Sequence, residues 1–371
     1  MGYHKLITEL MFLDQVCNFR CDYCSAPLKP ISVQNGVRTL VNGGKTVLLD
    51  ASDGTQLGKK MRGHLEKARE LEPTPILHLI GGELTLVHGI TDFILEASEQ
   101  YELIMLTTNG LLLDEQTIAQ LSACKNLLLL FSLDGHTFDM NSYRIKSPQM
   151  NSRLVNNLET CIKYGIRVEV QTVLHDRNIK KIKEFADYLL PFAMLGHYVK
   201  ITPFPVRWTQ GRIVLHNCDY TALSDMLEHY EHYQNVLPPQ KYLSNLLDFL
   251  ERGTRTTRCY VPYFVFGVDD RGRIKNCPCI PSICSSIDLS CDAVQRDIIK
   301  ERESYQTKRV CSGLCNTCFE GWEIYNAYLQ KTINKSELGQ VAVGRLESCV
   351  GVLDDIRENI IYNDNYSHFT V

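Results

Sequence analysis

The sequence contains no apolar run that approaches the ~20 residues needed to span a bilayer. Its first ten residues, "MGYHKLITEL", also lack the charged start, apolar middle and small-residue cleavage site of a signal peptide. The formal net charge is only -4, so the chain has no basic field that would attract a nucleic acid or a membrane surface. We therefore expect a cytoplasmic protein that binds neither.

With 371 residues, of which 44% are hydrophobic and 22% charged, the chain has a globular composition and can bury a substantial core. The feature that needs an explanation is its 15 cysteines. Disulfides rarely persist in a reducing compartment, whereas thiolate-bound metals do. One group of cysteines runs from Cys17 to Cys24 and a second from Cys259 to Cys318. The isolated ones are expected to be buried apolar side chains: Cys124, Cys161, Cys218 and Cys349.

Six short apolar runs alternate with helical patterns in the first 205 residues. The helical stretches, such as "NSRLVNNLETCIKYG", repeat apolar residues every three or four positions. This alternation predicts a parallel sheet with right-handed crossovers, and therefore an α/β fold. The expected strands are residues 5–14, 76–83, 103–110, 127–135, 167–175 and 197–204.

Two regions depart from this rhythm. "VRTLVNGGKTVLLD" predicts a hairpin and "LGKKMRGHLEKAREL" a helix, so residues 26–75 are expected to decorate the first crossover. After about residue 250 the chain becomes rich in loops and cysteines. We predict a barrel over residues 1–205, a helical linker over 206–254, a cysteine-rich domain over 255–325 and a helical tail over 326–371.

Polar signals follow the first four expected strands: the Cys17 to Cys24 group, then "GGE", "TTNG" and "SLDG". The C-terminal ends of the strands in a parallel strand-and-helix barrel meet at one rim, where such barrels carry their active sites. Buried strands do not need Gly-Gly-Glu or Asn-Gly at their ends. The four signals therefore predict a single site at that rim.

The stretch "CNFRCDYC" supplies three thiols. A structural zinc site takes four ligands, and so does a cubane iron-sulfur cluster held by protein alone. Three ligands would leave one iron open to a small molecule. Zinc bound by these three cysteines and a distant fourth ligand remains the alternative.

In this order, the C-x3-C-x2-C motif, "GGELTL", "TTNG" and "SLDG" resemble the radical S-adenosylmethionine (radical SAM) superfamily over residues 5–205. The resemblance implies a partial (β/α)6 barrel of the TIM type. It also implies that Cys17, Cys21 and Cys24 ligate a [4Fe-4S] cluster that binds SAM. The further SAM contacts that it implies are Tyr23 by the adenine, Gly81, Gly82 and Glu83 by the methionyl group, and Asn109, Ser132 and Arg144 by the ribose or carboxylate.

The second cysteine group resembles the auxiliary-cluster region of the SPASM/twitch subgroup. "CYVPYFVFGVDDRGRIKNC" reads as a hairpin with a thiol at each base, and a C-x2-C pair follows it. The resemblance implies one auxiliary [4Fe-4S] cluster, with zinc as the alternative. The expected ligands are Cys259, Cys277, Cys315 and Cys318. This leaves Cys279, Cys284, Cys291 and Cys311 without a role, unless Cys311 replaces a ligand or Cys279 and Cys284 support a second cluster.

The resemblance implies an enzyme that cleaves SAM to a 5'-deoxyadenosyl radical and takes a hydrogen atom from its substrate. An auxiliary cluster without an open iron favours net oxidation, so we expect an oxidoreductase that acts on a small hydroxylated molecule. A start of the first strand near residue 5 leaves no room for a leader-binding domain, which places a peptide substrate second. An electron donor such as flavodoxin or ferredoxin is implied, while no catalytic side chain is predicted. The alternative outside catalysis is an iron-sulfur or zinc protein.

Overall fold

The computed structural model describes residues 5–13, 15–24, 29, 31–34, 37–42, 45–206, 213, 215, 218–277, 287–288, 293–294, 296 and 318–358. Cys315 and the cysteines for which the sequence predicts no role (Cys279, Cys284, Cys291 and Cys311) therefore lie outside the described residues. None of the helices in these ranges is both long and apolar enough to cross a membrane.

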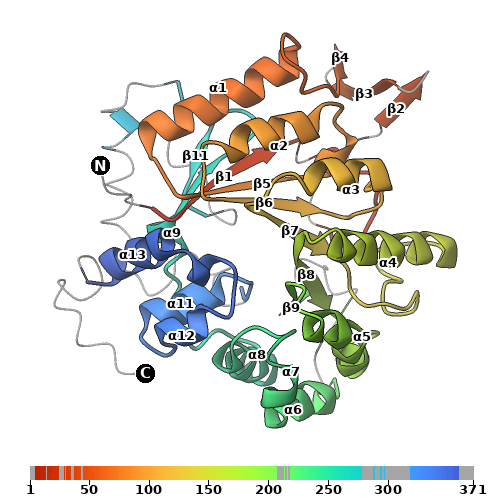
Figure 1. The fold of residues 1–371 in the computed structure, drawn as a ribbon, viewed down its shortest axis with the longest axis vertical. Helices are drawn as coiled ribbons and strands as arrows, with labels where there is room; N and C mark the ends of the chain where they lie inside the picture. Colours follow the sequence, from red (N-terminus) through yellow and green to blue (C-terminus); the bar gives the residue numbers. More distant parts are fainter. Residues whose placement is uncertain are drawn as a thin grey trace.

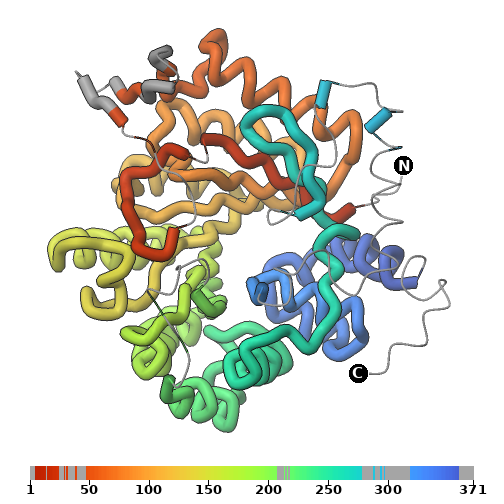
Figure 2. Tube along the Cα trace, turned by 180° about the vertical axis from the view of Figure 1, so that it is seen from behind, coloured from red at the N-terminus to blue at the C-terminus, as the bar shows by residue number. Residues whose placement is uncertain are grey.

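The six expected strands form one continuous parallel sheet in chain order, which confirms the α/β prediction. Each strand is mostly buried, because its alternate residues face the surrounding helices and the interior of the curved sheet. The sheet curves as a partial barrel (Figure 2). Its strands are β1 (Ile7–Phe12), β5 (Ile76–Gly81), β6 (Leu103–Thr108), β7 (Leu127–Ser132), β8 (Arg167–Leu174) and β9 (Val199–Pro205).

Helices cover the outer side of this sheet (Figure 1). Their starts carry the expected caps: Ser147 accepts a hydrogen bond from the N–H of Met150 before α4, and Asp114 accepts one from Thr117 before α3. The 3-10 turns η1 (Leu84–Leu86) and η2 (Ile179–Lys181) lead into the connections that follow β5 and β8. The covering helices are α1 (Gln56–Leu71), α2 (Ile90–Ser98), α3 (Glu115–Leu121), α4 (Pro148–Lys163) and α5 (Ile182–Met194).

The first crossover is decorated where the sequence predicts it. The expected hairpin is β3 (Val37–Asn42) paired antiparallel with β4 (Lys45–Leu48). A further strand, β2 (Ile31–Gln34), pairs with β3 and completes a separate three-stranded sheet before α1. The Asn-Gly-Gly signal therefore predicted the pairing of β3 with β4, but it did not predict β2.

The second expected hairpin also forms, as β10 (Val265–Val268) and β11 (Ile274–Lys275). Gly272 lies in its turn with φ +74°, a conformation that suits glycine. However, β10 pairs in parallel with β1, so the barrel sheet has eight strands, where the sequence predicted six. The reason is that β1 would otherwise expose a row of unpaired backbone groups at the edge of the sheet.

Helices dominate the rest of the chain. The C-terminal helix α11 contacts α8, and α13 contacts α9, so this end of the chain packs beside the barrel (Figure 1). The elements are α6 (Thr221–Glu228), α7 (Tyr230–Tyr233), α8 (Gln240–Arg252), α9 (Val261–Phe264), α11 (Glu323–Leu329), α12 (Lys335–Leu338), η4 (Val343–Arg345) and α13 (Glu347–Ile356).

Buried Lys5 fastens the start of β1 to the β10–β11 hairpin. Its ammonium donates to the carbonyl oxygens of Pro262 (3.0 Å) and Val265 (2.8 Å) and to the side-chain oxygen of Asn276 (2.6 Å). A buried charge is tolerated when several acceptors surround it in this way. The contact therefore couples the strand that leads into the first cysteine group to the hairpin of the second.

We expect Lys5→Met to lower the free energy of unfolding by about 2–4 kcal/mol, because three buried acceptors lose their charged donor. Urea unfolding followed by circular dichroism measures this. Lys67→Met is the matched control, since Lys67 forms an exposed pair with Glu70 that is worth at most about 1 kcal/mol. Equal effects of the two substitutions would show that Lys5 does not hold the hairpin.

Candidate functional site

A cavity of about 290 Å³ lies at the C-terminal ends of the parallel strands. All four segments that carry the polar signals contribute to it, as expected if these signals share one rim. Gly81 and Glu83 do not line it in the described part of the chain. The predicted site residues that line it are Cys17, Cys21, Tyr23, Cys24, Gly82, Asn109, Ser132 and Arg144.

The first three cysteines lie on the loop after β1 and are free thiols. The sulfur of Cys17 accepts hydrogen bonds from the backbone N–H of Phe19 (3.3 Å) and the side-chain amide of Asn109 (3.7 Å). Burial raises the pKa of the Cys21 thiol to about 12, although the nearby Arg144 guanidinium acts to lower it. Cysteine binds a metal as the thiolate, so a metal held here would favour the deprotonated form of Cys21 against the effect of burial.

The donor set fits a cubane cluster better than a single metal ion. No three His, Cys, Asp or Glu side chains in the described ranges converge closely enough to share one ion. In a cubane each cysteine binds a different iron, so the three sulfurs need not converge. Three thiols on one wall of a cavity satisfy this requirement and leave space beside them for a small molecule.

Gly81 and Gly82 are required by the packing of the "GGE" segment against the cysteine loop. A Cβ atom on Gly81 would lie 1.7 Å from the carbonyl oxygen of Phe12, and one on Gly82 would lie 1.9 Å from that of Val16. The N–H of Gly82 donates to the carbonyl oxygen of Leu13 at 3.1 Å. The glycines thus bring two rim segments into backbone contact, and Gly82 also reaches the cavity.

The carboxylate of Glu83 already has four donors. Its Oε1 accepts hydrogen bonds from the hydroxyls of Thr85 (2.6 Å) and Thr108 (2.8 Å) and from the N–H of Thr85 (3.1 Å). Its Oε2 accepts the N–H of Asn109 at 2.6 Å. Burial raises the pKa of Glu83, while these hydrogen bonds act to lower it. This arrangement gives Glu83 a positioning role, and a direct contact with SAM stays a prediction.

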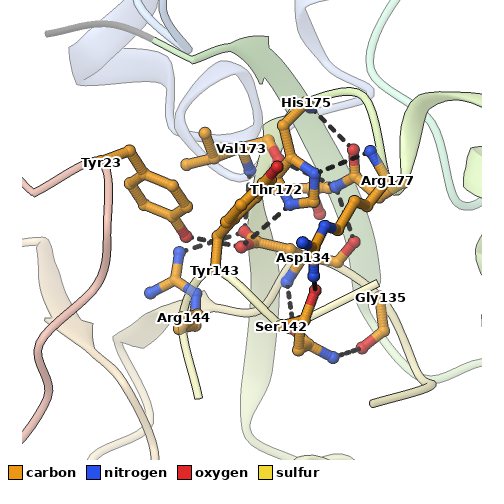
Figure 3. Close-up of polar contacts among 12 residues, drawn as sticks. Tyr23, Asp134, Gly135, Ser142, Tyr143, Arg144, Thr172, Val173, His175 and Arg177 are labelled. Atoms are coloured by element: carbon orange, nitrogen blue, oxygen red, sulfur yellow. Dashed lines mark hydrogen bonds and ion pairs between the residues drawn. The ribbon is translucent and has the colours of Figure 1, made fainter. Parts of the chain in front are cut away.

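Asp134, from "SLDG", is the centre of a buried polar cluster (Figure 3). Its Oδ1 lies 3.1 Å from the guanidinium of Arg144 and accepts the N–H of Val173 at 3.1 Å. Its Oδ2 accepts the hydroxyl of Tyr23 at 2.5 Å and lies 3.7 Å from Nε2 of His175. Burial acts to raise the pKa of Asp134, but the Arg144 charge and the hydrogen bonds hold it below its ordinary value. The fixed ion pair places Arg144 and Tyr23 in the cavity wall.

Sequence reasoning singled out neither Asp134 nor His175, although both stand in segments that it quoted. It also missed Asn18, whose side-chain oxygen accepts a hydrogen bond from Asn109 at 2.7 Å. Asn141 holds the Asp134 loop, because its side-chain oxygen accepts the Asp134 N–H at 2.8 Å. This contact keeps Asp134 in place to pair with Arg144.

Of the second cysteine set, the structure describes Cys259, Cys277 and Cys318. Burial raises the pKa of Cys259 to about 12, and Cys318 is close enough to add to that rise, while Arg255 opposes it. The guanidinium of Arg255 donates to the carbonyl oxygen of Cys318 (2.6 Å) and pairs with Glu323. This brings Cys259 and Cys318 together near one buried cation, whereas the prediction for Cys315 lies outside the described residues.

A second cavity, of about 280 Å³, lies among the six parallel strands and adjoins the first. Thr107, Ser132, Phe204 and Glu320 line both. Sequence reasoning missed this space, although polar residues at alternate positions of apolar strands were a usable signal. Its polar lining from the strands is Glu9, His78, Thr107, Ser132, Glu169, Gln171 and Thr202.

We expect Glu83→Ala to lower the free energy of unfolding by about 2–4 kcal/mol, because buried donors on Thr85, Thr108 and Asn109 lose their acceptor. Urea unfolding of the cluster-free protein measures this. Glu70→Ala is the control, since the Glu70 side chain is 65% exposed. Unchanged stability together with weaker SAM binding would instead assign the carboxylate to the cofactor.

Solved structures share this fold. The chain aligns with SuiB of Streptococcus suis bound to S-adenosylmethionine at a TM-score of 0.58 and 15% identity, covering 85% of this chain and 72% of that one. It aligns with anSMEcpe with bound AdoMet and a Cp18Cys peptide at a TM-score of 0.54 and 16% identity, covering 96% and 99%. At these identities the likeness is one of fold alone.

Curated relatives match part of the chain. Neomycin C epimerase of Streptomyces fradiae is 24% identical over 252 residues, which is 67% of this chain and 69% of that protein. Fe-coproporphyrin III synthase of Methanosarcina barkeri is 25% identical over 174 residues, which is 47% of this chain and 38% of that protein. The model of the radical SAM superfamily matches residues 13–189. That segment, just under half of the chain, contains the three thiols and the glycine pair, and over it the chain is similar to the radical SAM superfamily.

Proposed function

We propose that this protein is a radical SAM enzyme that removes a hydrogen atom from a small hydroxylated substrate held inside the barrel. The observation that carries the proposal is the pair of adjoining cavities: one walled by three thiols at the rim, the other enclosed by the strands below. Thr107 and Ser132 line both, so a molecule in the interior lies next to one at the rim. A reaction between two bound molecules needs this proximity.

The superfamily implies a [4Fe-4S] cluster and SAM. We assign Cys17, Cys21 and Cys24 to the cluster and the rest of the rim cavity to SAM. When bound, these cofactors supply reductive cleavage of SAM to methionine and a 5'-deoxyadenosyl radical, which takes a hydrogen atom from the substrate.

The chain's own residues position the two molecules and keep water out. The Asp134–Arg144 pair fixes Tyr23 and Arg144 in the wall of the rim cavity, where Tyr23 is available to the adenine and Arg144 to a carboxylate. Asn109 and Ser132 add an amide and a hydroxyl to the same wall. The strands surround part of the interior cavity, and exclusion of water there would protect a reactive intermediate from side reactions.

We assign the second cysteine set to an auxiliary [4Fe-4S] cluster of the SPASM/twitch kind on Cys259, Cys277, Cys315 and Cys318. The approach of Cys259 to Cys318 beside Arg255 supports this assignment. A cluster there would supply an acceptor for the electron that a substrate radical must lose when it becomes a carbonyl. This is why oxidation is the proposed outcome.

The curated relative that covers two thirds of the chain is named as an epimerase of neomycin C, a fact that favours a small substrate. It also raises a second outcome, in which the hydrogen atom is replaced on the opposite face and no electron is lost. A peptide is the alternative substrate, because structures of similar fold contain a precursor peptide or the Cp18Cys peptide.

Incubation in D2O separates oxidation from epimerisation. Oxidation lowers the product mass by two hydrogens, whereas epimerisation with a hydrogen donor that exchanges with solvent replaces one hydrogen of the product by deuterium.

We expect the anaerobically reconstituted protein to hold about eight irons per chain, as two cubanes. Replacement of Cys17, Cys21 or Cys24 by alanine should abolish 5'-deoxyadenosine formation and reduce the iron content to about four. Iron analysis and chromatography of the SAM products measure this. Cys124→Ala is the control, since Cys124 is buried away from both sets. Stoichiometric zinc with little iron would contradict the assignment.

We expect Cys259→Ala to remove the auxiliary cluster but to leave slow 5'-deoxyadenosine formation, because every proposed SAM contact lies before residue 145. The iron content should fall to about four per chain, and oxidised product should disappear. Cys218→Ala, at a partly exposed cysteine outside both sets, is the control and should keep its iron. Circular dichroism establishes that each variant folds, and product formation at the normal rate by a folded variant lacking the second cluster would disprove the electron-acceptor role.

A further inference from the structure

The interior cavity contains polar groups where a barrel of this kind normally packs branched aliphatic side chains. Its lining takes alternate residues from the strands, for example His78 and Ile80 on β5, and Thr202 and Phe204 on β9. None of the lysines or arginines in the described ranges lines it. The rest of the lining is largely apolar, and the charged side chains that reach the cavity from the described residues are acidic.

Thr202 is the clearest sign of a ligand. The residue is 2% exposed and lines the cavity, yet its hydroxyl has no hydrogen-bond partner among the described residues. The hydroxyl oxygen is not sealed from the cavity, so a bound molecule can supply the hydrogen-bond partner that the described residues do not. Ser132 and Gln171 also line the cavity, and their side chains make no hydrogen bonds within the described part of the chain. These three residues suit the hydroxyl groups of a ligand.

Glu9 supplies a buried carboxyl group. Glu9 is 3% exposed. Only its Oε2 has a hydrogen-bond partner among the described residues, which is Nδ1 of His78 at 3.1 Å. Nε2 of His78 lies 2.8 Å from the hydroxyl of Thr107. A His78 tautomer that donates from Nδ1 to Glu9 accepts the Thr107 hydroxyl through Nε2, and Oε1 of Glu9 then has no partner among the described residues. The chain Glu9–His78–Thr107 runs from the interior to the rim cavity.

Glu169 adds a second carboxylate on the far side of the cavity. Its Oε1 accepts the hydroxyl of Tyr198 at 2.8 Å. Burial raises the pKa of Glu169, while the Tyr198 hydrogen bond and nearby Lys200 act to lower it. The Lys200 ammonium is bound by the carbonyl oxygens of Gln234 (2.7 Å) and Leu237 (3.1 Å) and does not line the cavity. These carboxylates do not form a metal site, because no three such groups in the described ranges could hold one ion.

Trp322 and Tyr325 close the cavity from the C-terminal segment. The Trp322 ring lies 5.9 Å from the His78 ring, in an edge-on arrangement. Aromatic faces attract ammonium groups and cover the apolar faces of rings. The lining thus combines carboxylates, uncommitted hydroxyl and amide groups, and aromatic rings.

We propose that the interior cavity binds a polyhydroxylated small molecule that carries protonated amino groups, with its ammonium groups on Glu9 and Glu169 and its hydroxyls on Thr202, Gln171 and Ser132. This names the substrate class of the proposed function and rests on it. Carboxyl groups that line a cavity without a lysine or arginine from the described residues favour a cationic ligand.

Calorimetric titration of the full chain with 2-deoxystreptamine, and with myo-inositol as the matched ring without amino groups, tests the proposal. We expect 2-deoxystreptamine to bind at least about tenfold more tightly. Glu9→Gln should weaken it about ten- to a hundredfold, as expected for loss of a charge-assisted hydrogen bond. Thr202→Val should weaken it by about three- to tenfold, the effect of one neutral hydrogen bond.

Glu70→Gln, on the exposed surface, is the control and should bind normally. If Glu9→Gln does not fold, Glu169→Gln and Thr202→Val decide the question. Equal affinity for the two probes, no binding of either, or wild-type affinity in the folded cavity variants would overturn the proposal. The proposed radical chemistry is tested separately from binding. It is contradicted if protein with full iron content forms no 5'-deoxyadenosine yet still binds 2-deoxystreptamine.

Discussion

Glu83 joins three of the four rim segments through its backbone and its carboxylate. Its backbone N–H donates to the carbonyl oxygen of Val16 on the cysteine loop, and its side chain holds the hydroxyl of Thr108 and the N–H of Asn109 at the end of β6. Asn109 in turn contacts the sulfur of Cys17. The position of the first thiol therefore depends on a hydrogen-bond network that the protein forms itself, and the site is organised before a cofactor arrives.

Stability and function use opposite faces of the same strands. On β5 and β6 the residues that face the helices, such as Leu77, Leu79 and Leu106, are fully buried and apolar. Their alternate neighbours, His78 and Thr107, face the interior cavity. Because side chains alternate along a strand, the outer layer can supply the hydrophobic burial while the inner layer carries polar groups that would weaken a single packed core. The fold thus tolerates an open, acidic interior.

The sequence was sufficient for the six parallel strands and the thiol-lined rim, because strand periodicity and short motifs are local signals. It was not sufficient for the pairing of β10 with β1, which joins residues more than 250 positions apart and depends on an edge visible only in the assembled sheet. Glu83 was predicted at the rim, but its motif does not reveal that Thr85, Thr108 and Asn109 occupy its oxygens. Glu9 and Glu169 were missed because the strand pattern placed them in strands but did not show which face of the sheet each residue occupies.

The second cysteine set and the interior cavity are mechanically connected. Cys318 is two residues before Glu320, which lines both cavities, and the same segment continues into Trp322 and Tyr325. Arg255 binds the carbonyl oxygen of Cys318 and pairs with Glu323, so one buried cation fixes the cysteine and the cavity wall together. Any metal bound by Cys318 therefore helps to set the shape of the space beside it. A cluster at this position would contribute to substrate selection through the wall that it stabilises, in addition to any part in electron transfer.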